Sequence, residues 1–198
     1  MTHSLFTITP YLRQLTVVAL SVVLLAGCST RQVSDTLSGA TAQRLVTLSL
    51  NNFIEDLAEQ PEVAALAGRS IHLGVHFLKD HQLLDYATHL ISAQLQIIHE
   101  MEITDPDMPA DFDVDIFFNS MGTDSDDFGL SIPTLGVATT PDGTINILAL
   151  DMYHGITEGY AIVKADDGKI EKTERILARI RRDNVSTPVF NFPLNQVD

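Results

Sequence analysis

An apolar run near the N-terminus, LTVVALSVVLL at residues 15–25, sets the first constraint on this chain. The run has 11 residues, whereas a helix that spans a bilayer needs about 20, so it is too short to cross a membrane. A run of this length behind a single basic residue, Arg13, is typical of the apolar part of a secretory signal peptide. We therefore predict that residues 1–27 are an export signal and that the folded protein follows it.

The apolar run leads into LAGC at residues 25–28, and Cys28 is the only cysteine of the chain. This tetrapeptide resembles the lipobox of bacterial lipoproteins, in which the chain is cut before the cysteine and the thiol carries a diacylglycerol. The resemblance implies that Cys28 is lipidated and that acyl chains such as palmitate anchor the protein, at about 0.8 kcal/mol per buried CH₂. In lipoproteins an Asp after the cysteine retains the chain at the inner membrane. Ser29 stands there instead, which implies the cell outer membrane, with the folded part facing the periplasm.

The charge balance limits the partners that this chain can bind. It has 12 Lys and Arg against 26 Asp and Glu, which gives a formal net charge of −14 and a pI near 4.6. Nucleic acid requires a basic surface, so we expect no nucleic-acid partner. A single cysteine can form neither an internal disulfide nor a cysteine-rich zinc site.

Periodicity predicts the secondary structure after the cysteine. Residues 28–40 combine the lipidated Cys with small and polar residues and predict a flexible tether, followed by one periplasmic α/β domain over 41–198. Residues 170–182 alternate like a strand but also contain good helix formers, so both assignments stay open. The other predicted elements are helices over 41–59, 62–67 and 82–101, strands over 70–78, 113–120, 144–153 and 158–165, a hairpin turn at 166–169, and loops over 102–112 and 121–143. For the long loop over 121–143, a short strand or hairpin within it stays open.

This order of elements predicts an α+β or α/β fold, with a single small mixed sheet covered by two helices and ending in a β-hairpin. Together with the lipobox, it resembles a group of periplasmic α/β proteins that includes the curli-export lipoprotein, the lipoprotein activators of penicillin-binding proteins, and the N-terminal domain of TolB. The resemblance covers about residues 41–182 and implies a domain that binds other proteins or forms homo-oligomers. The chain departs from it at 121–143, a segment rich in Gly, Pro and Asp.

Histidines offer two candidate metal sites. His72 and His76 share one face of a predicted strand, but about 13 Å of strand separates them, which is too far for one metal ion without other ligands. His81, Asp85 and His89 follow one another at intervals of four residues and could line one helix face. A solvated helix face explains the same spacing.

Three acids, Asp124, Asp126 and Asp127, stand in DSDDFG, which is similar to the start of a calcium loop. Phe128 occupies a position where an oxygen ligand is needed, and Leu135 stands where a bidentate Glu should be. A solvated acidic loop is therefore favoured, and a docking surface for a basic partner is the functional alternative.

The sequence gives little support for a catalytic site. There is no G-x-S-x-G motif and no glycine-rich phosphate loop. Asp151 and His154, with Glu158 nearby, could form an acid/base pair, although a hydrogen-bonded strand end explains them equally well. We predict no enzymatic activity and no cofactor.

Basic residues are concentrated toward the C-terminus of the chain. If residues 170–182 form a strand, Arg175, Arg179 and Arg181 share one face, which could meet an acidic protein, a polysaccharide or lipid headgroups. Pairing with the chain's own acids is the alternative. The basic residues of this region are Lys164, Lys169, Lys172, Arg175, Arg179, Arg181 and Arg182.

The sequence thus predicts a non-enzymatic outer-membrane lipoprotein that serves as an accessory or assembly factor of a cell-envelope machine, for secretion, surface-structure assembly or peptidoglycan synthesis. It would act through protein–protein interaction with an envelope protein. Two alternatives stay open: an envelope hydrolase or metal-binding protein that uses the Asp/His segments, and a glycan-binding module.

Overall fold

A computed structural model describes residues 31–33, 39–78, 81–133 and 144–195. The chain divides into two compact units. Unit 1 comprises Met1–Ser34, Ser125–Met152 and Arg182–Asp198, and unit 2 comprises Asp35–Asp124 and Tyr153–Arg181. The predicted export signal at residues 1–27 and Cys28 after it lie outside the described residues, so lipidation stays a prediction.

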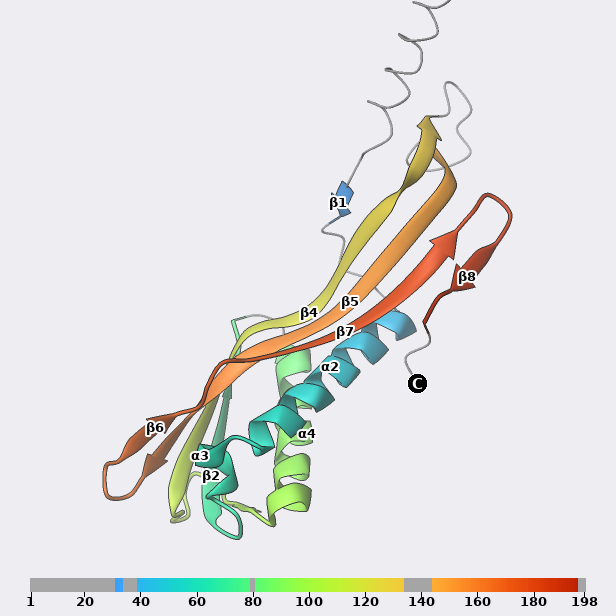
Figure 1. The fold of residues 1–198 in the computed structure, drawn as a ribbon. Helices are drawn as coiled ribbons and strands as arrows, with labels where there is room; N and C mark the ends of the chain where they lie inside the picture. The colour runs from blue at the N-terminus through green and yellow to red at the C-terminus, as the bar shows by residue number, and fades with distance from the viewer. Residues whose placement is uncertain (1–30, 34–38, 79–80, 134–143, 196–198) are drawn as a thin grey trace, which may run out of the picture. The chain divides into compact units, whose positions relative to one another are not determined.

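Three long strands contribute residues to both units (Figure 1). They are β4 (Phe112–Pro133), β5 (Thr144–Ala165) and β7 (Ile176–Ser186).

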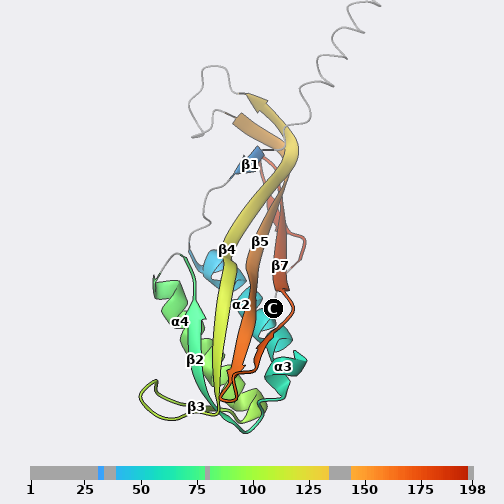
Figure 2. The same ribbon diagram turned by 90° about the vertical axis from the view of Figure 1, so that its left-hand side faces the viewer.

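Unit 2 is a mixed sheet with helices on one face, as Figures 1 and 2 show. Its strands run in the order β3-β2-β4-β5-β7, with β6 also paired to β5, and β2 is parallel to both β3 and β4. This arrangement confirms the predicted α+β fold class. The elements that belong wholly to unit 2 are α2 (Ala40–Ala58), α3 (Pro61–Ala64), β2 (Ser70–His76), α4 (His81–His99), β3 (Glu102–Ile103) and β6 (Ile170–Lys172).

The core of unit 2 follows from the apolar periodicity of its elements. Leu50, Phe53, Ile54 and Leu57 recur at helical spacing along α2 and are completely buried. They pack against alternate residues of the strands, among them Ile116. A buried hydrogen bond of 2.9 Å between the hydroxyls of Ser49 and Thr157 also links α2 to β5.

The two glycines in the second half of β5 do not interrupt the strand, contrary to the prediction of separate strands over 144–153 and 158–165. A Cβ on Gly155 would overlap the carbonyl oxygen of Leu45 in α2, and one on Gly159 would lie 2.6 Å from the carbonyl oxygen of Phe117. These glycines therefore allow close backbone approach within a continuous strand.

The loop prediction for 121–143 is wrong as far as Pro133, because β4 continues through this segment. At Gly129 the chain approaches the backbone of Leu148 and Ala149 closely. Pairing with neighbouring strands supplies the stabilisation that Gly-rich and Asp-rich local sequence lacks. Residues 134–143 lie outside the described residues.

The hairpin turn at 166–169 is confirmed. Gly168 has a φ of 85°, the left-handed conformation that glycine adopts without steric cost, and the amide of Lys169 donates to Asp167 Oδ1 at 2.9 Å. The chain returns as β6 and then β7, so residues 170–182 are largely strand and not helix. Between them, the buried hydroxyl of Thr173 accepts a hydrogen bond from the amide of Ala161 at 2.9 Å.

Unit 1 is made of strands in the part of it that the structure describes. Within the predicted tether, β1 (Arg31–Val33) pairs antiparallel with residues 125–127 of β4. On β7, residues 184–186 pair with β8 (Asn191–Pro193). No helix in the described ranges combines the length and the apolar character that a membrane span needs.

Candidate functional site

The face of the unit 2 sheet opposite the helices carries a set of polar and aromatic side chains, which we call the open face. The alternation of β2 and β4 produces it, because Ile71, Val114 and Ile116 point into the core and their neighbours point outward. The open face consists of His72 and His76 on β2, Asp113, Asp115, Phe117 and Asn119 on β4, Glu158, Tyr160 and Lys164 on β5, Lys172 on β6, and the adjoining Arg175.

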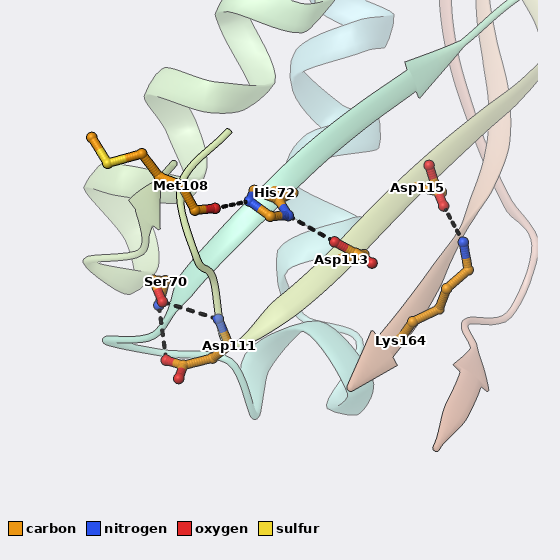
Figure 3. Close-up of polar contacts among 7 residues, drawn as sticks. All are labelled: Ser70, His72, Met108, Asp111, Asp113, Asp115 and Lys164. Carbon is orange, nitrogen blue, oxygen red and sulfur yellow. Dashed lines mark hydrogen bonds and ion pairs between the residues drawn. The ribbon is translucent and has the colours of Figure 1, made fainter. Parts of the chain in front are cut away.

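At one end of the open face, His72 and Asp113 are neighbours on the parallel strands β2 and β4 (Figure 3). His72 Nδ1 lies 2.8 Å from Asp113 Oδ1, and its Nε2 lies 2.7 Å from the carbonyl oxygen of Met108. Both ring nitrogens thus face an acceptor, which only the protonated imidazolium satisfies fully. These contacts, the Asp113 hydrogen bond foremost, raise the pKa of His72 above its ordinary 6.5.

Asp115 lies in the next row and joins three strands. It accepts hydrogen bonds from His76 Nε2 at 2.9 Å and from Lys164 Nζ at 2.7 Å. Burial disfavours the charged carboxylate, but the hydrogen bonds from Lys164 and His76 outweigh it, so the pKa of Asp115 lies below its ordinary 3.8. Gly74 makes room for this carboxylate, since a Cβ there would lie 2.5 Å from Asp115 Oδ1.

A row of rings crosses the middle of the open face. The ring of Phe117 stacks on His76, with centroids 4.6 Å apart, and on Tyr160, with centroids 5.6 Å apart. The ammonium of Lys172 lies 4.0 Å from the centre of the Tyr160 ring. This cation–π contact completes a row of groups contributed by four strands.

Beyond the rings, the carboxylate of Glu158 interacts with two donors. It accepts from Asn119 Nδ2 at 3.2 Å and from Arg175 Nε at 2.5 Å. The aromatic row therefore lies between two polar clusters, one centred on Asp115 and one on Glu158.

The structure places the predicted basic residues in different surroundings. Lys164 and Arg175 pair with acids of the open face, and Lys169 pairs with Glu171 at 2.7 Å in the hairpin. On β7, Arg179 Nε lies 3.3 Å from Nδ1 of the buried His154. Arg181 also lies on β7 and is exposed. A role of these residues in binding a partner stays a prediction.

The predicted acidic segment is strand and not loop. Asp124 lies in unit 2, whereas Asp126 and Asp127 in unit 1 are strand partners of Gln32 and Arg31. Consecutive residues of a strand point to opposite faces, unlike the ligands of a calcium loop. In the described residues, no group of three His, Cys, Asp or Glu side chains is placed to hold a metal ion.

The remaining candidates have separate contacts. On α4, Asp85 and His89 are exposed, and the side chain of His81 lies outside the described residues. In unit 1, Asp151 accepts a short hydrogen bond from Ser186, and an acid/base role for Asp151, His154 and Glu158 stays a prediction.

Sequence reasoning missed Asp113, Asp115, Phe117, Asn119 and Tyr160. The signal for the four β4 residues was present, because DVDIFFNS alternates apolar core positions with these outward positions. Tyr160 gave no such signal, since only the pairing of β5 with β4 brings its ring to Phe117.

Unit 1 carries a second surface, which we call the apolar surface. A pocket of about 440 Å³ lies within it, lined mainly by Phe128, Leu130, Leu148, Val185 and Leu194. The exposed large hydrophobic residues of the apolar surface are Phe128, Leu130, Ile147, Leu148, Val189, Phe190, Phe192 and Leu194.

Comparison of the chain with protein-family models and with curated protein sequences found no match.

Proposed function

We propose that this protein is a lipid-anchored, non-enzymatic component of the bacterial cell envelope that binds an envelope protein through the open face of unit 2. Cys28 would attach it to the outer membrane, with both units in the periplasm. In this role it serves as an accessory or assembly factor of an envelope machine. The observation that carries the proposal is the aromatic row between two polar clusters on a face that the helices leave open.

The composition of the open face suits a protein interface. Interfaces place aromatic groups at the centre and hydrogen-bonding groups around them, and Tyr and Arg contribute strongly to binding. Phe117 and Tyr160 have the central position here, and Arg175 lies at the side of the Glu158 cluster.

Internal pairing also favours binding. Asp115 and Glu158 already accept hydrogen bonds within the chain. A partner that covers them would therefore not bury a carboxylate that lacks a hydrogen-bond donor. The same contacts hold the side chains in place before binding, which reduces the entropy lost on association. The helices pack against the other face of the sheet and so support this surface from behind.

Glycan binding is the second candidate, and the aromatic row favours it specifically. Aromatic rings at a protein surface stack on the apolar faces of sugars, and the flanking Asn119 and Glu158 could hydrogen-bond hydroxyl groups. Peptidoglycan is the glycan that a periplasmic surface would meet.

A photocrosslinking residue at Asn119 in living cells tests the proposal. We expect one discrete protein product that disappears when Tyr160→Ala removes the central ring. Tyr86→Ala is the control, because Tyr86 is an exposed tyrosine of unit 2 that lies on α4 and not on the open face, where Tyr160 is half-buried. Equal crosslinking in both variants would contradict the proposal. A product that muramidase releases, with sedimentation on sacculi that depends on Tyr160, would establish the glycan alternative.

A further inference from the structure

The apolar surface of unit 1 lacks a covering within the described residues. Of the buried hydrophobic side chains that the structure describes, Ala149 alone belongs to unit 1. Eight of the fifteen exposed large hydrophobic side chains belong to this unit. A concentration of exposed apolar groups marks a contact with a protein or a membrane.

The segments that form the apolar surface are also uncharged. Residues 128–133, 144–150 and 184–195 contain no Asp, Glu, Lys or Arg, although 19% of the chain is charged. Phe190 lies at the turn between β7 and β8 and Phe192 lies within β8, with ring centroids 5.9 Å apart. Uncharged apolar segments with exposed aromatic rings suit partial insertion into a bilayer, because aromatic rings are favoured at its interface and a charge is costly in the hydrocarbon beneath it.

Exposure on both faces of one strand favours a bilayer over a single protein partner. Ile147 and Leu148 are consecutive residues of β5, so they point to opposite faces of the sheet. Ile147 is 40% exposed and Leu148 is 55% exposed. A partner docked on one face would cover only one of them, whereas lipid surrounds both.

The predicted lipid anchor at Cys28 is close in sequence to a strand, β1, that pairs beside the apolar surface. Arg31 of β1 is the strand partner of Asp127, which immediately precedes Phe128 of the apolar surface. Only three residue steps separate Cys28 from Arg31, so covalent geometry limits their Cα atoms to about 11 Å apart. Acyl chains on Cys28 would therefore enter the bilayer beside the apolar surface.

We propose that the apolar surface of unit 1 lies in the membrane interface beside the acyl chains of Cys28. The bilayer then holds the protein through its lipid and through protein side chains. This inference rests on the proposed lipid anchor and adds to it a defined part of the chain in contact with lipid.

The chain has no Trp, so a single introduced Trp reports its own surroundings. We would compare full-length lipidated protein carrying Phe190→Trp or Phe128→Trp with the control Tyr86→Trp on α4. Phe190 is 60% exposed and Tyr86 is 45% exposed, so each substitution keeps a ring at the surface. Each variant is reconstituted in vesicles of phosphatidylethanolamine and phosphatidylglycerol with brominated acyl chains, and its flotation and emission are measured.

We expect all three variants to float with the vesicles. Trp at 190 and at 128 should shift to the blue and lose emission to the brominated chains, and Trp at 86 should do neither. Floating protein in which no unit 1 reporter is quenched would overturn the inference while leaving the anchor intact. A blue shift without bromine quenching would overturn it in favour of a second protein copy. Failure of all variants to float would overturn the anchor itself, and the inference with it.

Discussion

The two units of this protein differ in how far their apolar residues are buried. In unit 2, two helices cover one face of the sheet and bury residues such as Phe53, Ile91 and Ile116 completely. In unit 1, large apolar residues such as Phe128 on β4 and Leu148 on β5 stay exposed. Apolar residues stabilise a fold only where folding removes them from contact with water. Unit 2 therefore has a core of its own, whereas Ala149 is the only buried hydrophobic residue in the described part of unit 1.

The largest expected difference between the units concerns a buried and an exposed phenylalanine. Phe53→Ala removes a ring that is fully buried and packs against Phe118 at 5.1 Å, so it should lower the free energy of unfolding by about 3–5 kcal/mol. Phe128→Ala in unit 1 removes a ring that is 56% exposed and should cost about 0.5 kcal/mol or less. Urea unfolding followed by far-ultraviolet circular dichroism measures both losses, because the signal reports the helices α2 and α4 of unit 2 and the strands of both units.

Comparable losses of unfolding free energy from Phe53→Ala and Phe128→Ala would contradict this difference between the units, because they would show that unit 1 buries a core of its own.

A smaller effect is expected on the open face of unit 2. Asp115→Asn keeps the size of the side chain but removes the charge that Lys164 pairs with, at 2.7 Å. Since Lys164 is partly exposed and water screens the pair, the loss should be about 1 kcal/mol or less. Because folding lowers the pKa of Asp115, its contribution is present above pH 3.8 and is lost as the pH falls through the lowered pKa.

Acid unfolding curves of the wild type and the variant measure this difference. Asp85→Asn on the exposed face of α4 is the control. If the wild type and Asp115→Asn respond to acid identically, the contacts of Asp115 do not support the fold.

The smallest effect should come from His72 at the end of the open face. Its pKa is raised in the folded chain, so its contacts with Asp113 and Met108 stabilise the fold fully below pH 6.5. That contribution is lost as the pH rises through the raised pKa. Unfolding free energies measured on either side of neutral pH should therefore fall with rising pH in the wild type, and this fall should be weaker in His72→Gln. The same fall in both proteins would assign it to other groups.

Local sequence patterns predicted much of the fold. Helical spacing at Leu45, Phe53 and Leu57 predicted α2, and alternation around Ile71 predicted β2, because residues a few positions apart show directly which side of a helix or strand is apolar. The Gly168 turn was predicted for the same local reason, since only a few residue types adopt its backbone conformation readily.

The extent of β4 and β5 was not predictable in this way. Their glycines and acids read as loop signals, but strands far apart in the sequence pair across them. For the open face, sequence alternation placed Asp115 and Phe117 on one side of β4. Only the register with β2 and the pairing with β5 decided that they meet His76, Lys164 and Tyr160.

The sequence by itself determined the predicted export signal, the lone Cys28, the positions of the helices, and which residues of each strand face the core. The tertiary structure alone decided which charges pair and where apolar side chains stay exposed. The physical reason is range: a turn of helix or a pleat depends on residues a few positions apart, whereas strand pairing joins residues such as Asp115 and Lys164, which are distant in sequence.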